Sequence, residues 1–255
     1  MSEVLKVEHL TERFGGLTAL KDINMSVSKG EIVGIIGPNG AGKTTLFNVI
    51  TGVYSPSEGK VLINGQDTAG KKPYEITKMG FSRTFQNIRL FPRMTVLENV
   101  MMGSYCRTKS NILQILFNTK KQREEYKVSR KRAEELLGML NLSGFKYQYP
   151  KSLPYGEQRR LEIARALATG PEVLLLDEPA AGMNDQETAE LMETVQELKN
   201  MNYTIILIEH DMKFVMNICE RLYVLDHGEL IAQGTPSQVS NDEKVIEAYL
   251  GKDED

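Results

Sequence analysis

The sequence predicts an α/β protein in which a mixed sheet is covered by helices, with an antiparallel β subdomain and an inserted α-helical subdomain. Three continuous apolar runs, at residues 32–36, 173–176 and 205–208, are typical of parallel strands buried on both faces. Apolar and polar residues alternate near the N-terminus, which predicts antiparallel strands, whereas residues 95–142 show helical spacing only. The order strand, helix, strand between residues 173 and 208 implies a right-handed parallel crossover and a doubly wound core.

The length suits one large α/β domain. A chain of 255 residues buries a full core, so we expect residues 1–255 to form a single domain. Within it we expect the core and the antiparallel subdomain at residues 1–94 and 171–250, and the helical subdomain at residues 95–170. Residues 251–255 are expected to fray.

The charge balance and the cysteines argue against several classes of protein. The 31 basic and 34 acidic residues give a net charge of −3, so no global attraction to nucleic acid is expected. Cys106 and Cys219 lack metal-site spacing, which predicts free thiols in a reducing compartment. No apolar run approaches the roughly 18 to 20 residues that span a bilayer, and Glu3, Lys6 and Glu8 interrupt any signal-peptide core. A soluble, cytosolic chain is expected.

The N-terminal region predicts the antiparallel subdomain. Alternation at residues 5–8 and 23–27 is typical of two half-buried strands. Phe14 lies between them beside two glycines and has two interpretations, an exposed ring that stacks on a base or a ring packed in the core. The apolar run 61–63, followed by an Asn-Gly turn, is expected to return to the same sheet.

The helical segment opens with a capping box in which Thr95 caps a helix and Glu98 reaches back to it. Its last helix carries an apolar stripe over residues 133–140. The basic run at residues 120–132 has two interpretations, a solvated helix face or a contact for lipid headgroups or an acidic partner. The apolar segment 112–117 is too short to span a membrane, and either packs inside the subdomain or docks on another protein.

The C-terminal third returns to alternating strands and helices. The helix between the last two buried runs presents an apolar face over residues 191–198. Apolar runs at 222–225 and 230–232, on either side of a His-Gly turn, predict a hairpin. A last helix is expected from Thr235, with proline in its first turn and Gln238 completing a capping box.

A glycine-rich loop, GPNGAGKTT, follows the first buried run. It matches G-x-x-x-x-G-K-[ST], and its glycines allow consecutive amides to turn inward and cradle an anion at the N-terminus of the next helix. Lys43 adds positive charge against the outer phosphates, and Thr44 offers a hydroxyl to Mg²⁺. The candidate phosphate-binding residues are Gly37, Pro38, Asn39, Gly40, Ala41, Gly42, Lys43, Thr44 and Thr45.

Acidic residues follow the other two buried runs. Asp177 and Glu178 end the run VLLLDEP, at the sheet edge where open α/β sheets bind ligands. Asp177 is positioned to hold Mg²⁺ through water, and Glu178 to act as general base for water that attacks the terminal phosphate. His210 comes at the end of the next strand, where it either senses that phosphate or is a capped core histidine.

A further motif, LPYGEQRRLEIARALA, begins at residue 153. Tyr155 and Gly156 open a helix whose free amides can meet an anion. With the glycine loop, Gln86 in TFQNIRLF, the run VLLLDEP and His210 in LIEHD, this segment resembles the ATP-binding-cassette (ABC) ATPases. The five motifs occur in the family's order over nearly the whole chain. The resemblance implies the ABC ATPase fold, which has a RecA-like P-loop NTPase core.

The resemblance also implies roles for individual residues. Phe14 would stack on the adenine of ATP, and Gln86 would link Mg²⁺ and the attacking water to a transmembrane partner. Tyr155, Gly156 and Glu157 would contact the nucleotide held by a second ATPase subunit, identical or different, in a head-to-tail dimer with two ATP molecules. The expected catalytic residues are Glu178, His210, Gln86 and Lys43, and the expected Mg²⁺ site consists of Thr44, Gln86 and Asp177.

Two motifs depart from the common family pattern. The usual signature is LSGGQ, whereas this chain has Pro154, Tyr155 and Glu157 in place of the serine, the first glycine and the glutamine. The missing hydroxyl leaves recognition of the terminal phosphate to backbone amides and the helix dipole. Asn184 stands where an aspartate is usual, which puts its cross-subunit contact in doubt.

The segments LPYGEQRRLEIARAL, EPAAGMN and RTFQNIRLF are similar to the ATPase subunits of prokaryotic branched-chain amino acid importers. This similarity implies permease partners, an extracytoplasmic substrate-binding protein that acts indirectly, and a place on the cytoplasmic face of the cell membrane. One alternative is another ABC system, such as a lipopolysaccharide or lipid exporter or a urea or amide importer. A soluble ABC ATPase of DNA repair or translation is the other, but no second cassette or strong positive charge supports it, and no nucleic-acid partner is expected.

Overall fold

The computed structural model describes residues 2–107 and 119–250. The chain divides into two compact units, the first comprising Met1–Arg83 and Glu172–Asp255, and the second Thr84–Pro171. The second unit therefore begins at residue 84, eleven residues before the predicted boundary at residue 95. The apolar segment 112–117 and the tail at 251–255 lie outside the described residues.

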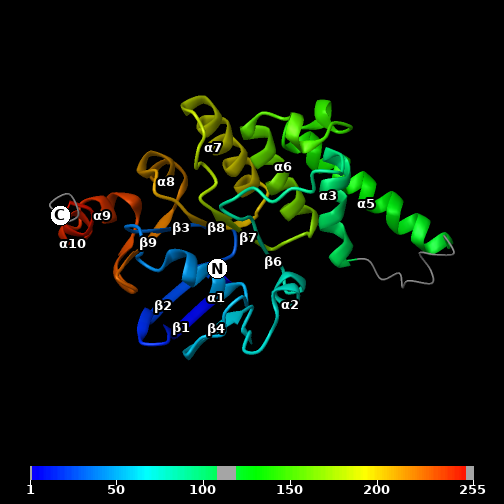
Figure 1. Ribbon diagram of the computed structural model, residues 1–255. Helices are drawn as coiled ribbons and strands as arrows, with labels where there is room; N and C mark the ends of the chain where they lie inside the picture. Colours follow the sequence, from blue (N-terminus) through cyan, green and yellow to red (C-terminus); the bar gives the residue numbers. More distant parts are fainter. Residues whose placement is uncertain (1, 108–118, 251–255) are drawn as a thin grey trace. The chain divides into compact units, whose positions relative to one another are not determined.

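The first unit is built on a main sheet with the strand order β10-β9-β3-β8-β7-β6, in which all strands except β10 run parallel to one another (Figure 1). The three predicted buried runs are β3 (Ile32–Ile36), β7 (Val173–Asp177) and β8 (Thr204–Ile208), and every residue of these strands is buried. β9 (Arg221–Asp226) pairs in parallel with β3, and β10 (Glu229–Gly234) turns back antiparallel to β9 as the predicted hairpin. The short strand β6 (Phe81–Arg83) was not predicted.

A small antiparallel sheet packs beside the main sheet and has the order β2-β1-β4-β5. Its strands are β1 (Glu3–Phe14), β2 (Leu17–Ser28), β4 (Glu58–Ile63) and β5 (Gln66–Asp67). The prediction of an antiparallel subdomain at the N-terminus is confirmed, although β1 and β2 are longer than the alternation indicated. Several register shifts occur between β1 and β2, and they interrupt the strict period of two in the sequence.

Helices cover both faces of the main sheet. α1 (Lys43–Ile50) lies on the side of the small sheet, whereas α7 (Asp185–Asn200) and α8 (Met212–Ile218) lie on the other (Figure 1). One continuous core joins alternate residues of the main strands to α1 and the small sheet. On the opposite face, Gly34 leaves room for side chains of α8 and β9, because a Cβ there would lie 2.6 Å from Leu222.

Two helices of the first unit were not predicted from the sequence. The predicted capping box at Thr235 begins α9 (Pro236–Ser240), but a further helix, α10 (Glu243–Leu250), follows it, so α9 is not the last helix. The helix α2 (Pro73–Lys78) was also not predicted, because its 6 residues are too few to show a helical period of apolar residues.

The second unit contains three α-helices within its described residues, α3 (Val96–Ser104), α5 (Lys120–Met139) and α6 (Tyr155–Ala168). Short 3₁₀ turns lie between them, at Tyr105–Arg107, Ser143–Phe145 and Pro150–Ser152. The Thr95 and Glu98 capping box is present at the start of α3. The basic run at residues 120–132 and most of the apolar stripe at residues 133–140 belong to one continuous helix, α5.

Candidate functional site

The glycine-rich loop joins β3 to α1 in the predicted order. Gly37, Gly40 and Gly42 have φ angles of 146°, 82° and 103°, a region that residues with side chains rarely adopt. A Cβ on Gly37 would lie 2.0 Å from the carbonyl oxygen of Leu225 in β9. Only glycine therefore permits this close approach of the loop to the neighbouring strand.

Lys43 is the first residue of α1, and its side chain folds back over the loop. Its Nζ donates to the carbonyl oxygens of Gly37, at 2.7 Å, and Pro38, at 2.9 Å. The residue is buried, and no acidic residue lies in the first turn of α1. The ammonium group and the positive end of the helix dipole thus meet at one point, which favours a phosphate group there.

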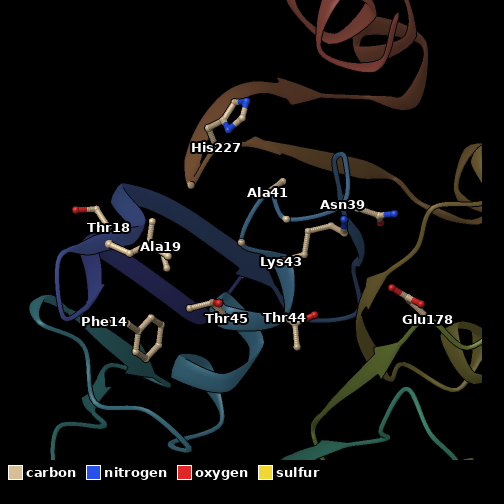
Figure 2. A pocket seen from close by; sticks show the side chains of 14 residues that line it. Phe14, Thr18, Ala19, Asn39, Ala41, Lys43, Thr44, Thr45, Glu178 and His227 are labelled. Atoms are coloured by element: carbon tan, nitrogen blue, oxygen red, sulfur yellow. The ribbon is translucent and has the colours of Figure 1, made fainter. Parts of the chain in front are cut away.

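A cavity of about 480 Å³ opens over this loop. In Figure 2, Lys43, Thr44 and Thr45 lie between Phe14 on one side and Glu178 on the other. Phosphate-loop, aromatic and acidic side chains from separate segments are thereby brought to one place. The lining residues are Phe14, Leu17, Thr18, Ala19, Asn39, Gly40, Ala41, Gly42, Lys43, Thr44, Thr45, Glu178, His227 and Gly228.

Phe14 is the last residue of β1, and the residue is 42% exposed. The ring of Tyr54 meets it edge-on, with centroids 5.1 Å apart and an interplanar angle of 73°. The interpretation of Phe14 as a core residue is therefore wrong, because its ring lines the cavity and retains exposed surface. An exposed ring supported from one side is suited to stacking on a nucleobase.

The turn between β9 and β10 forms another part of the cavity wall. The amide of Gly228 donates to Ala41 O at 3.1 Å, and its carbonyl accepts from the amide of Lys21 at 2.8 Å. His227 lines the cavity from this turn (Figure 2). The sequence predicted the turn but not its place in the site, because that place depends on β9 lying next to β3 in the sheet. Nothing in the sequence pattern marks Thr18 or Ala19 as cavity residues.

Asp177 ends β7 and is buried, at 3% exposure. The guanidinium of Arg83, in the neighbouring strand β6, donates to its Oδ2 at 2.6 Å and to the side-chain oxygen of Asn48 in α1 at 2.7 Å. The pair ties the acidic strand end to the helix that follows the phosphate loop. Sequence reasoning missed Arg83, because β6 is only three residues long.

Glu178 follows directly and lines the cavity. Its φ angle is +47°, and its amide donates to Ile208 O at 2.9 Å, so the backbone turns sharply at the end of β7. A residue with a side chain in this strained region is typical of functional turns. His210 follows the end of β8, and its Nδ1 lies 4.0 Å from the Glu178 carboxylate.

His210 is exposed, with 59% of its side chain accessible, so the alternative of a capped core histidine is wrong. The buried residue is its neighbour Glu209, at 1% exposure. Glu209 accepts from the amides of Ala180, at 2.7 Å, and His210, at 3.1 Å. Burial raises the pKa of the Glu209 carboxyl, while these amides and His210 oppose the shift. Glu209 thus fixes the turn after Glu178 to the end of β8.

The remaining predicted residues lie in the second unit. α6 begins at Tyr155, directly after Pro154, which provides no side-chain cap. Gly156 is buried in the first turn, and Glu157 accepts from Arg160 at 2.9 Å. The carbonyl of Gln86 accepts from Arg159 of the same helix at 2.9 Å.

Asn184, the departure after VLLLDEP, has a clear local role. Its side chain accepts from the amide of Glu187, and the Glu187 carboxylate accepts from the amide of Asn184, both at 3.0 Å. This capping box starts α7. Asparagine caps a helix as well as aspartate does, so the departure preserves the helix start.

Two oxygen donors of the predicted Mg²⁺ site, Thr44 and Asp177, belong to the first unit. Among the described residues no group of three or more His, Cys, Asp or Glu side chains is gathered in a metal-binding arrangement. Mg²⁺ is commonly held by one or two protein oxygens together with substrate phosphates and water. The Thr44 hydroxyl in the cavity and the Asp177 carboxylate at the end of β7 are oxygen donors of this kind.

Comparison with known proteins decides the family. A model of the ABC transporter family matches residues 20–181, more than half of the chain. The chain belongs to this family. A second model, described as branched-chain amino acid ATP-binding cassette transporter, matches residues 229–255. ABC ATPases hydrolyse ATP, and this family member is therefore an ATPase.

Curated relatives match over almost the full length of this ABC ATPase. LivG of Escherichia coli K12, a high-affinity branched-chain amino acid transport ATP-binding protein, is 46% identical over 250 residues, or 98% of each chain. BraF of Pseudomonas aeruginosa, which bears the same description, is 43% identical over the same shares.

Solved cassettes confirm the predicted fold class. The ADP conformation of an ATP-binding cassette from an ABC transporter matches with a TM-score of 0.86 and 37% identity, and covers 99% of this chain and 100% of its own. A dimeric post-hydrolysis cassette bound to ADP and phosphate matches with a TM-score of 0.76 and 29% identity over 91% of this chain and 98% of its own. Cassettes of this family act with membrane permease subunits. Within residues 2–107 and 119–250, no helix is long and apolar enough to cross a membrane.

Proposed function

We propose that this ATPase powers the import of branched-chain amino acids through permease subunits, from the cytoplasmic face of a prokaryotic membrane. The observation that carries the proposal is the full-length similarity to LivG and BraF, supported by the match of residues 229–255. Similarity to LptB of Haemophilus influenzae, a lipopolysaccharide export ATP-binding protein, is lower at 35% over 250 residues. An extracytoplasmic substrate-binding protein would deliver the amino acid without touching this chain.

The site residues of the first unit take the following roles. Phe14 stacks on adenine, while the loop from Gly37 to Thr45 and Lys43 hold the phosphates. Mg²⁺, when bound by Thr44 and Asp177, neutralises charge on the phosphates. Glu178 accepts the proton of the attacking water, and His210 orients the terminal phosphate.

The second unit supplies the remaining groups. Gln86 contributes to the Mg²⁺ site and connects it to the permease. Tyr155, Gly156 and Glu157 contact the nucleotide of a second ATPase subunit through backbone amides at the start of α6, where the helix dipole favours an anion. A head-to-tail dimer therefore holds two ATP molecules, and its closure and reopening drive the permease.

Reconstitution tests the substrate. The ATPase, the permease that co-purifies with it from the native membrane and the matching binding protein are placed in vesicles, and uptake of labelled leucine, isoleucine and valine is measured. We expect ATP-dependent uptake, and none when Glu178→Gln replaces the wild-type chain. A purified complex that hydrolyses ATP but imports none of these amino acids would refute the proposed substrate and leave the ATPase assignment intact.

A further inference from the structure

A buried ion pair in the second unit joins two of the proposed functional segments. Arg159 and Glu162 lie on α6, four and seven residues after Tyr155, and both are fully buried at 0% exposure. Their side chains approach to 3.1 Å. The next residue, Arg160, is also arginine but pairs with Glu157 near the surface, so only one arginine of the RR sequence enters the interior.

The pair holds the backbone around Gln86, which we call the Gln86 segment and define as residues 85–89. The guanidinium of Arg159 donates to Phe85 O at 2.8 Å and to Gln86 O at 2.9 Å. The Glu162 carboxylate accepts from the amide of Arg89 at 3.3 Å. Arg165, one turn later on α6, donates to Arg89 O.

These contacts are specific to the shape of the guanidinium. Two consecutive carbonyls and a carboxylate accept from one planar fork, and a lysine ammonium cannot reproduce that geometry. Burial of two charges is costly unless their hydrogen bonds are made, and here main-chain groups of the Gln86 segment supply several of them. Burial raises the pKa of the Glu162 carboxyl, and Arg159 opposes the shift.

We propose that Arg159, supported by Glu162, is a positioning residue that fixes the Gln86 segment to the helix carrying Tyr155, Gly156 and Glu157, so that the two segments move as one body. The inference rests on the proposed roles of Gln86 and of the start of α6. Arg159 touches neither the nucleotide nor the reacting atoms. It sets the main-chain position from which the Gln86 side chain acts, and so affects the rate of hydrolysis rather than the binding of ATP.

The test compares full-length variants. Removing Arg159 alone leaves a buried unpaired carboxylate and risks unfolding, so the informative variant is Arg159→Met with Glu162→Met, which replaces both charges with apolar side chains of similar volume. Arg159→Lys keeps the charge but loses the fork. Arg130→Met is the control, because Arg130 pairs with Glu134 on the exposed face of α5. Gln86→Ala shows the loss expected when the Gln86 side chain itself is absent.

Three quantities are measured, namely amide hydrogen exchange of peptides that cover the Gln86 segment, the affinity for a fluorescent ATP analogue, and kcat and KM for hydrolysis. In the double variant we expect exchange at least 10-fold faster, ATP affinity within about twofold of wild type, and kcat lowered about 10-fold toward that of Gln86→Ala. Arg159→Lys should show the same split between kcat and KM in weaker form, and Arg130→Met should match wild type.

Other outcomes overturn the inference. Unchanged exchange in a folded double variant would show that Arg159 does not hold the segment. Faster exchange with full kcat, while Gln86→Ala is slow, would show that the contact is structural only. If Gln86→Ala also hydrolyses ATP normally, the proposed role of Gln86 is the part that fails, and the exchange data then show separately whether Arg159 anchors the segment.

Discussion

The two compact units fix their functional loops by different physical means. In the first unit, the loop from Gly37 to Gly42 is held by close main-chain contact with β9, which only glycine permits. In the second, the Gln86 segment is held by charged side chains of a helix that are fully buried. The glycine loop can be recognised in the sequence because no other residue type fits its positions. A buried arginine cannot be distinguished from an exposed arginine on a helix by the sequence alone.

The comparison predicts which glycine-to-alanine substitution in the phosphate loop is most destabilising. We expect Gly37→Ala to abolish ATP binding and to lower the free energy of unfolding by roughly 2 to 6 kcal/mol, because the added Cβ lies 2.0 Å from Leu225 O and φ is 146°. Gly40→Ala is the matched control within the same loop. Its φ is also positive, at 82°, but no atom lies within 4 Å of an added Cβ, so only the backbone strain of about 1 to 2 kcal/mol remains.

Thermal unfolding and titration with ATP measure both variants. Equal losses in Gly37→Ala and Gly40→Ala would show that backbone strain alone, and not the contact with β9, determines the need for glycine. That result would also remove the contrast between the two units, because the loop would then owe its position to local conformation rather than to a neighbouring strand.

Glu178→Gln tests the chemistry of the first unit without changing its shape. The amide cannot accept the proton of water, so we expect hydrolysis to slow by about 100-fold or more while ATP binding persists and an ATP-bound dimer accumulates. Glu193→Gln is the matched control, since Glu193 is an exposed residue of α7. Phosphate release and size-exclusion chromatography with ATP are the measurements. Wild-type turnover in Glu178→Gln would remove Glu178 from the catalytic site.

Phe14→Ala tests the opposite side of the cavity and should have a smaller effect. Loss of a stacked ring weakens nucleotide binding by about 1 to 3 kcal/mol. Because Phe14 is 42% exposed, the melting temperature should fall by only a few degrees. Tyr74→Ala, which removes another exposed ring from the same unit, is the control and should bind ATP normally. Unchanged ATP affinity in Phe14→Ala would exclude stacking on adenine.

The elements that the sequence predicted correctly are those with a strong local signal. Residues of β3, β7 and β8 are buried without exception, so each strand shows as an unbroken apolar run. The capping boxes at Thr95 and Thr235 are likewise local. By contrast, β6 and α2 are too short to display a period, and the basic half of α5 lacks the apolar stripe that would have joined it to residues 133–140.

The same division holds for the candidate site. The sequence pointed to Lys43 and Thr44 through the spacing of the glycine loop, and to Glu178 through its place at the end of an apolar run, and the structure gathers them around one cavity. Arg83 and His227 escaped notice because their roles come from the order of strands in the sheet. Arg83 reaches Asp177 only because β6 lies next to β7, and no sequence pattern states that order.

Each unit contains one cysteine, and the two cysteines differ in their access to solvent. Modifying them should have the smallest effect on function of the changes considered. Cys219 is buried in the first unit, where burial and two nearby carboxylates raise the pKa of its thiol to about 12. Cys106 is exposed in the second unit. Because this pKa is far above 8, almost no thiolate exists at Cys219 at pH 8. The thiolate is the form that reacts, so Cys219 should be inert. We expect a maleimide to modify Cys106 and to leave Cys219 protected in the folded protein.

Mass spectrometry of labelled peptides at pH 8, with Cys106→Ser as the matched control, measures both sites. Hydrolysis of ATP should be unchanged after labelling, because Cys106 is not one of the proposed site residues. In increasing urea, Cys219 should become reactive only when the first unit unfolds, so its labelling reports the stability of that unit alone. Raising the pH from 8 to 9 should speed the labelling of a thiol about tenfold when its pKa lies well above 9, because the thiolate fraction rises tenfold. For Cys219 the labelling rate at pH 8 is negligible, so the rate at pH 9 should remain low. Labelling of Cys219 at the rate of Cys106 in native buffer would contradict the burial of Cys219. It would show that the face of the main sheet covered by α8 opens far more often than the close packing of Gly34 against Val215 and Leu222 allows.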